Sequence, residues 1–302
     1  MKQFKAFHPV NWTKLLLPWL LLGSAWANDP TADALRSRFA MASQQALRIV
    51  VDKQVFLQSA EVSGRLQGEV YALLDHPFDD ISHTLGRADH WCDILILHLN
   101  VKYCRASLGG PAEVLDAGLG RKFDQALSDV YWVRFSYRAT SSDGFLAVVL
   151  QAPDGPLGTS DYRIEVQATP SSASQTILHM RYGYAYGLSA RLAMQAYLAT
   201  LGSDKVGFSV IGQRSDGQPL QVRGVRGVVE RNTLRYYLAI DAFLEAQALP
   251  ATQQLQASLQ GWFAATERYA QQLHEVDRDS YVGMKLREVQ RQRTQTAPAA
   301  KP

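Results

Sequence analysis

Three tyrosines at alternate positions, Tyr182, Tyr184 and Tyr186, form the clearest chemical pattern in the sequence. Successive side chains of a β-strand point to opposite faces, so these three rings would share one face of a strand. Such a row can line a pocket with apolar rings while its hydroxyls orient a polar group of a ligand. It can equally be a packed face beneath a helix. The pattern leaves both roles open.

Three histidines, His76, His83 and His90, recur every seven residues among several aspartates, a spacing that would align them on one continuous helix. Pro77 and Gly86 are expected to interrupt that helix. The His-x3-His and His-Glu-x-x-His spacings of zinc sites are also missing. We therefore expect surface or capping histidines, with no metal site and no bound cofactor.

Charged residues gather on the segment that is predicted to form a long helix, among them Glu230, Arg235 and Asp241. Asp241 lies among apolar residues, where a carboxylate is costly to bury alone, so we expect an arginine beside it. Glu230 and Asp241 could act as an acid and a base in an enzyme, and an internal ion pair could recognise a ligand head group. Structural pairing or simple exposure is the other alternative.

Familiar catalytic motifs are absent from the sequence. It contains no Gly-x-Ser-x-Gly nucleophile elbow, no phosphate-binding loop and no dinucleotide-binding fingerprint. The segment from Gly207 to Gly212 lacks the required glycine spacing. Catalysis is therefore unsupported, although an enzyme can assemble its site from distant positions.

Two cysteines, Cys92 and Cys104, lie twelve residues apart. In an oxidising compartment an isolated pair most simply forms one disulfide, and we expect that bond here. A redox role usually requires Cys-x-x-Cys spacing, which is absent. Two free buried thiols are the competing arrangement, because residues this far apart on one straight strand could not meet.

The first residues contain the three parts of a cleavable secretory signal peptide. Three lysines precede an apolar run that starts at Leu15, and Ala25-Trp26-Ala27 has the small-x-small cleavage pattern. A membrane-spanning helix would need roughly 20 apolar residues, more than this run supplies. We expect residues 1–27 to be removed and the protein to act in the periplasm or outside the cell. An uncleaved anchor or a buried helix is the alternative.

Charge and composition limit the classes of protein that remain. The chain has 302 residues, with 31 Lys and Arg against 28 Asp and Glu. Three of the basic residues and none of the acidic ones lie in residues 1–27, so the expected mature chain carries 28 of each. A neutral chain lacks the basic footprint of a nucleic-acid-binding protein. The hydrophobic share of 47% suffices for a core, and we expect one main domain.

The predicted elements begin with a helix over residues 32–47, where apolar residues recur at helical spacing. Two strands around a Ser63-Gly64 turn follow, then two short helices over residues 78–85 and 88–94. The middle of the chain has short strands separated by turn clusters, which indicates an antiparallel sheet. These strands are predicted over residues 97–105, 128–138, 145–151, 162–168 and 176–187, with a further strand over 205–211 after a helix over 188–201.

Two helices are predicted after the sheet, a long one over residues 227–248 and an amphipathic one over 255–273. The last residues, from Lys285 onward, are rich in Lys and Arg and finish in Thr, Ala and Pro. We expect them to fray into a solvated basic tail. Such a tail could make a peripheral contact with a membrane or an envelope partner.

This order of elements resembles the START-like (SRPBCC) superfamily, whose fold wraps a curved sheet around a long C-terminal helix. Residues 69–81 with Leu85 and Trp91 look like the family's first strand and helix pair, and residues 224–238 are similar in position to its closing helix. Two features depart from the family pattern, the helix over 188–201 and the helix after the expected end. The resemblance implies an α+β helix-grip fold over residues 28–250, followed by a C-terminal helix and tail over residues 251–302.

The resemblance also implies a cavity between the sheet and the long helix that holds a lipid, sterol, polyketide or other apolar molecule. The residues that we expect to bind this ligand are Tyr182, Tyr184, Tyr186, Trp91, Phe208 and Arg235. The leading hypothesis is an exported protein that binds or carries an apolar ligand. One alternative is a cell-envelope hydrolase or cyclase that uses carboxylates and arginine in the same cavity. Another is an envelope interaction protein that acts through its C-terminal helix.

Overall fold

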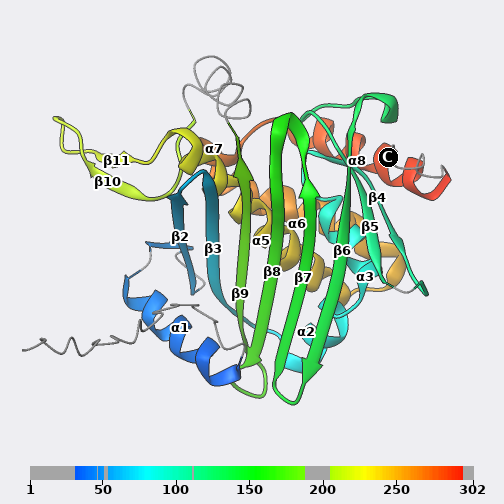
Figure 1. Cartoon of the computed structure of the whole chain (residues 1–302), viewed down its shortest axis with the longest axis horizontal. Helices are drawn as coiled ribbons and strands as arrows, with labels where there is room; N and C mark the ends of the chain where they lie inside the picture. Colours follow the sequence, from blue (N-terminus) through cyan, green and yellow to red (C-terminus); the bar gives the residue numbers. More distant parts are fainter. Residues whose placement is uncertain (1–30, 46, 51–53, 111, 188–204, 295–302) are drawn as a thin grey trace, which may run out of the picture.

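The centre of the structure is an antiparallel sheet of nine strands in the order β1-β2-β3-β9-β8-β7-β6-β5-β4 (Figure 1). The computed structural model describes residues 31–45, 47–50, 54–110, 112–187 and 205–294. The predicted signal peptide over residues 1–27 and the predicted helix over 188–201 lie outside these described residues.

The strands and helices have the following bounds. The strands of the sheet are β1 (Leu47–Val50), β2 (Val55–Val62), β3 (Arg65–Leu74), β4 (Val101–Ser107), β5 (Val114–Leu119), β6 (Tyr131–Ser142), β7 (Phe145–Asp154), β8 (Thr159–Pro170) and β9 (Thr176–Tyr186). A separate hairpin consists of β10 (Val210–Gln213) and β11 (Pro219–Gln221). The described helices are α1 (Ala32–Gln45), α2 (Phe78–Leu85), α3 (Ala88–Leu95), α5 (Gly224–Gln247), α6 (Ala251–Glu267), α7 (Ala270–Leu273) and α8 (Arg278–Thr294).

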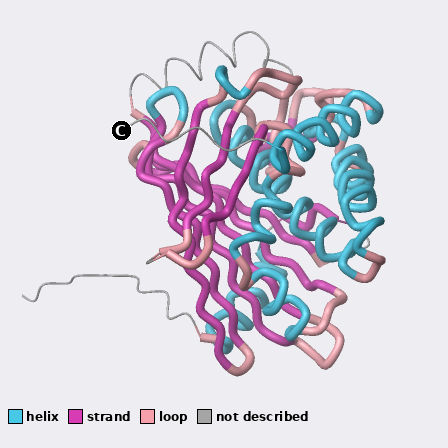
Figure 2. Tube along the Cα trace, turned by 90° about the vertical axis from the view of Figure 1, so that its right-hand side faces the viewer, coloured by secondary structure: helices cyan, strands magenta, loops and turns pink. Residues whose placement is uncertain are grey.

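One face of the sheet packs on the long helix α5. Inward-facing residues such as Val70 of β3 and Met180 of β9 are fully buried in the main core, together with Val229 and Leu234 of α5. Figure 2 shows the sheet as one layer and most of the helices as a second layer beside it. The predicted α+β fold, a curved antiparallel sheet that grips a long helix near the C-terminus, is confirmed. This is the arrangement that the resemblance implies.

The helix approaches the sheet most closely at Gly68 of β3. A Cβ atom at Gly68 would lie 2.2 Å from Oγ1 of Thr233 on α5, so any side chain there would push the helix away. The Thr233 hydroxyl donates to the Val229 carbonyl at 2.7 Å, which fixes its position on the helix. Besides β3, α5 also packs on β2 and β9. The helix therefore lies over one half of the sheet.

The opposite face of the sheet carries α1. Leu35 packs with Phe145 and Ile177, and Ala42 packs with Phe56 and Tyr71. These strand residues alternate with those that face α5, as the pleat of a strand requires. The helix predicted over residues 32–47 is present but ends at Gln45, and Leu47 begins β1.

The structure differs from the predicted strands at β5 and at β10. Residues 114–119 form β5 although Asp116 and Gly118 give them weak strand character, because the strands on both sides, β4 and β6, pair with them. The strand predicted over residues 205–211 begins only at Val210 and pairs with β11 instead of the main sheet. Of the described helices, none has the length and hydropathy that crossing a bilayer requires.

The last described residues pack on the domain. Helix α6 lies along α5, and α8 lies along the edge strand β4. The solvated basic tail predicted from Lys285 is therefore wrong for residues 285–294, which form the second half of α8. Lys285 and Glu288 are 0% exposed. Arg287 and Arg291 of the same helix form ion pairs with Asp124.

A buried cluster of three charges joins α8 to β4. Glu288 forms ion pairs with Lys285 at 2.7 Å and with Lys102 of β4 at 3.0 Å. The Lys285 ammonium also donates to the carbonyls of His98 and Val101 at 2.8 and 2.9 Å. One carboxylate and two carbonyls thus offset the cost of burying two lysines.

The predicted disulfide is present between Cys92 of α3 and Cys104 of β4, with the Cα atoms 5.1 Å apart. The two cysteines lie on different elements, because the chain reverses direction after α3 and returns as β4. Both residues are buried in the core. The bond fixes α3 against the edge strand.

Removing the disulfide should lower the free energy of unfolding by about 3 kcal/mol, because the bond closes a loop of 12 residues and restricts the unfolded chain. Urea unfolding with and without reductant measures the difference. A double variant, Cys92→Ala with Cys104→Ala, should unfold at the same urea concentration in both conditions. Two thiols that are alkylated without added reductant in the exported protein would contradict the bond.

The buried lysine cluster should make stability rise with pH above neutrality. Burial lowers the pKa of Lys285 from 10.5 to about 8, and burial also lowers the pKa of Lys102. Between the folded and unfolded pKa values the unfolded chain binds more protons, so the free energy of unfolding increases as the pH increases. Urea unfolding at about pH 7.5 and about pH 9.5 should show this increase.

The matched variant is Lys285→Met. Its free energy of unfolding should rise less between these two pH values, because the substitution removes one of the two titrating lysines. A wild-type protein that becomes less stable across this pH interval would contradict the burial of a charged lysine.

Candidate functional site

A cavity of about 520 Å³ lies between α5 and the sheet. Tyr162, Tyr182 and Tyr184 form its wall on β8 and β9, and Val228, Asn232 and Tyr236 form its wall on α5. Its remaining sides come from β5 and β6, from His98 and Asn100 before β4, and from the loop that includes Gln125. A volume in the range of about 300–1,000 Å³ is typical of sites for small molecules.

Four tyrosine rings make the apolar surface of the cavity continuous. Tyr162 stacks on Tyr184 with ring centroids 5.2 Å apart. Tyr182 packs against Tyr184 at 5.8 Å and against Tyr236 at 5.1 Å. Tyr182 and Tyr184 are 5% and 4% exposed. The sequence left open whether these tyrosines line a pocket or form a packed face. Both descriptions apply to Tyr182 and Tyr184, because their rings are packed together and also line the cavity.

Three of these rings, Tyr182, Tyr184 and Tyr236, have hydroxyls without a hydrogen-bond partner among the described residues. Burial raises the pKa of each of these three hydroxyls, so they remain protonated. They can donate a hydrogen bond to a molecule in the cavity.

The other four candidate ligand-binding residues lie outside the cavity lining. The Tyr186 hydroxyl donates to Glu61 on β2. The Trp91 indole donates to the Leu85 carbonyl at 2.8 Å within the packed α2–α3 corner. Phe208 packs edge-on against Tyr269, and Arg235 forms an ion pair with Glu275 at 2.7 Å.

Sequence reasoning missed the polar residues of the lining, His98, Gln125 and Asn232. They come from three separate segments, and none belongs to a recognisable motif. His98 gives a weak signal, because it is the one polar residue in the run from Ile94 to Leu99. The other two resemble ordinary surface amides.

The structure separates the two carboxylates that were considered as an acid and base pair. Glu230 is fully buried and accepts hydrogen bonds from the backbone N–H groups of Phe208 and Ser209 and from the hydroxyls of Ser209 and Ser59. Asp241 follows eleven residues later on α5, about 16 Å along the helix axis. Neither carboxylate lines the cavity. Glu230 instead holds β2 and the segment before β10 against α5.

A second charged network lies on the face of the sheet that carries α1, away from the cavity. Glu69 accepts hydrogen bonds from His179 and Arg181 at 3.1 Å and from Tyr71 at 3.0 Å. Burial raises the pKa of Glu69, but the hydrogen bond from His179 and the charges of His179 and Arg181 outweigh it and hold this pKa well below its usual range. These contacts compensate the buried carboxylate and serve the structure.

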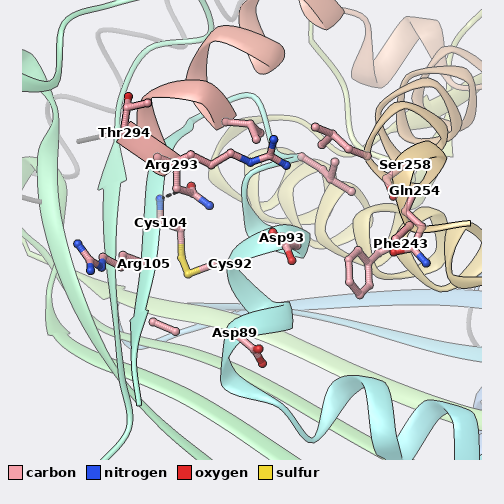
Figure 3. Close-up of a pocket in the computed structure, with 16 residues that line it drawn as sticks. Asp89, Cys92, Asp93, Cys104, Arg105, Phe243, Gln254, Ser258, Arg293 and Thr294 are labelled. Atoms are coloured by element: carbon pink, nitrogen blue, oxygen red, sulfur yellow. Dashed lines mark hydrogen bonds between the residues drawn. A yellow bond between two sulfur atoms is a disulfide. The ribbon is translucent and has the colours of Figure 1, made fainter. Parts of the chain in front are cut away.

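A second hollow, of about 610 Å³, lies between α3, β4, α6 and α8 beside the disulfide (Figure 3). Asp93 and Arg293 enter it from different walls, and Phe243 is its one aromatic residue. Burial raises the pKa of Asp93. Within the described ranges, no three His, Cys, Asp or Glu side chains are grouped as a metal site needs. The tyrosine-lined cavity is the better site for an apolar molecule.

Comparisons with known proteins give similarities of structure only. No family model matches the chain. No curated protein matches it. Norcoclaurine synthase from Thalictrum flavum, as a point mutant with a transition-state analogue, is 13% identical, with a TM-score of 0.32 over 51% of this chain and 91% of that chain.

Two lipid-transfer proteins give similar values. A fragment of the STAR-related lipid transfer protein from Xanthomonas axonopodis is 14% identical, with a TM-score of 0.35 over 52% of this chain and 90% of that chain. Human StAR-related lipid transfer protein 5 is 10% identical, with a TM-score of 0.34 over 56% of this chain and 87% of that chain. Scores this low carry no argument, and the helix-grip arrangement follows from the chain's own sheet order and from the position of α5.

Changing Tyr184 to Phe should alter the free energy of unfolding by less than about 0.5 kcal/mol, because the hydroxyl that it removes has no partner among the described residues. The matched control is Tyr281→Phe. The Tyr281 hydroxyl donates to the Leu97 carbonyl at 2.9 Å in the core, so its loss should cost about 1 kcal/mol or more.

Urea unfolding of both variants measures these costs. Equal destabilisation by the two changes would show that the Tyr184 hydroxyl has a structural partner. Tyr184→Ala should in contrast cost several kcal/mol, on the order of other large-to-small changes in a core.

Proposed function

We propose that this protein is exported and that it binds or carries an apolar molecule in the tyrosine-lined cavity. The observation that carries the proposal is the cavity itself, about 520 Å³ of space walled by packed tyrosine rings between the sheet and α5. A concave space of this volume, lined mainly by aromatic and apolar side chains with a few polar groups, is typical of sites for small molecules.

Two features support export. Residues 1–27 have the pattern of a cleavable signal peptide. The disulfide between Cys92 and Cys104 is of a kind that persists in oxidising compartments such as the periplasm.

Binding fits the residues better than hydrolysis does. Glu230 and Arg235, which a hydrolase would use, are committed to hydrogen bonds and ion pairs that join elements of the fold. The tyrosine hydroxyls of the cavity stay protonated and so offer hydrogen bonds but no general base.

Filling the cavity should abolish binding without unfolding the protein. Val228 is partly buried on α5 and lines the cavity, so Val228→Trp places an indole in the ligand's space. The control is Val210→Trp on β10, where the side chain is 52% exposed. The readout is the fluorescence of N-phenyl-1-naphthylamine, a neutral apolar probe, together with native mass spectrometry and lipid extraction of protein recovered from the periplasm.

We expect the parent and Val210→Trp to bind the probe and Val228→Trp to lose it. Native mass spectrometry reports in the same measurement whether residues 1–27 have been removed. A parent protein that neither retains a ligand nor binds the probe would refute the proposed binding function, and an intact leader would refute the predicted cleavage.

A further inference from the structure

Three polar side chains of the cavity, Gln125, His98 and Asn232, use their acceptor atoms within the protein. The Gln125 side-chain oxygen accepts from the backbone N–H of Arg121 at 2.7 Å, and Nδ1 of His98 accepts from the backbone N–H of Asn100 at 3.1 Å. The Asn232 oxygen faces Nη1 of Arg235 at 3.4 Å. These contacts also fix the orientation of the amides and the tautomer of the imidazole.

The N–H groups of the same three side chains have no acceptor among the described residues. Across the described ranges, no acceptor binds the side-chain NH2 of Gln125 or Asn232, and Nε2 of His98 is buried without a partner. Burial holds the pKa of His98 well below its usual value, and nearby cations lower it further, so Nε2 carries the proton of a neutral ring. Each group therefore presents a donor.

The tyrosine wall adds donors to the same space. The hydroxyls of Tyr182, Tyr184 and Tyr236 have no partner among the described residues and can donate to a ligand. The Tyr162 hydroxyl is different, because Thr159 gives its own proton to the Pro156 carbonyl at 2.5 Å and must accept from Tyr162 at 2.9 Å. Donors thus predominate in the polar part of the lining, where the remaining side-chain acceptors include the Asn100 oxygen and the exposed Asp129 carboxylate.

Charges around this end of the cavity favour an anion. Arg121 lies in the lining, and four cations, Lys102, Lys122, Arg235 and Lys285, lie close enough to His98 to lower its pKa. Glu275 and Glu288 form ion pairs with these cations. The one carboxylate in the lining is Asp129, which is exposed and accepts a hydrogen bond from Ser128.

We infer that the cavity selects an apolar molecule with a carboxylate at one end. The apolar part packs on the tyrosine rings, and the carboxylate oxygens accept hydrogen bonds from Asn232, Gln125 and the tyrosine hydroxyls. A carboxylate only accepts, which complements a lining in which free donors predominate, and hydrogen bonds to an ionised acceptor are stronger than neutral ones. This inference rests on the proposed binding function and specifies its ligand class.

Three probes with the same twelve-carbon tail test the head group: dodecanoate, dodecanol and dodecyltrimethylammonium. Each is used below its micelle-forming concentration to displace N-phenyl-1-naphthylamine from the full-length mature protein. We expect dodecanoate to bind about tenfold more tightly than dodecanol or better, and dodecyltrimethylammonium to bind most weakly. Equal affinities for the acid and the alcohol would overturn the inference and leave the proposed function intact. Failure of the naphthylamine probe and of all three tails to bind would overturn the proposed function.

The variant that isolates the donor is Asn232→Asp, which keeps an oxygen for Arg235 but replaces the NH2 group by a second acceptor. It should weaken dodecanoate binding about tenfold or more while changing dodecanol binding little. The matched control is Gln256→Glu on the exposed face of α6, which adds the same charge outside the cavity and should change neither affinity. Asn232→Ala serves as a second variant if the aspartate impairs folding, with thermal unfolding of every variant as the check. An unchanged ratio of acid to alcohol affinity in a folded Asn232 variant would overturn the assignment.

Discussion

The burial of α5 is the constraint on which the rest of the structure depends. A helix of 24 residues with most of its side chains buried needs cover on every side, and the sheet supplies one side while α6 supplies another. The same helix carries Glu230 and Arg235, whose charges are costly to enclose. Glu230 takes its partners from the segment before β10, and Arg235 takes Glu275 from the segment after α7. The charges of the helix thus fix the elements that follow the sheet.

The cavity arises where this cover is incomplete. Helix α5 lies over β2, β3 and β9, so the inner surface of β8, β6 and β5 extends past the helix and is lined by large aromatic rings. Rings of Tyr162, Tyr182, Tyr184 and Tyr236 support one another at centroid distances of 5.1 to 6.4 Å. The wall can therefore hold its shape without a side chain filling the space in front of it, and polarity enters only at the end near His98.

The sequence was informative wherever a local pattern determines the structure. Helical spacing predicted α1, α5 and α6, and the alternation of tyrosines placed Tyr182 and Tyr184 on one face of β9, which faces the cavity. Local patterns did not predict the structure where contacts between residues distant in the sequence determine it. The charge of Lys285 suggested an exposed side chain, yet Glu288 and the carbonyls of His98 and Val101 make its burial tolerable. The donors of the cavity could not be predicted, because Gln125 and Asn232 are ordinary amides until folding commits their oxygens.

The close contact between Gly68 and Thr233 helps to set the distance between α5 and the sheet. It holds the helix against β3, while the cavity lies on the side of β8. A side chain at position 68 would displace α5 and so change the space between the helix and the sheet, although it would not touch a ligand. Differences in ligand size among proteins with this architecture should therefore be sought at this contact as well as in the residues that line the cavity.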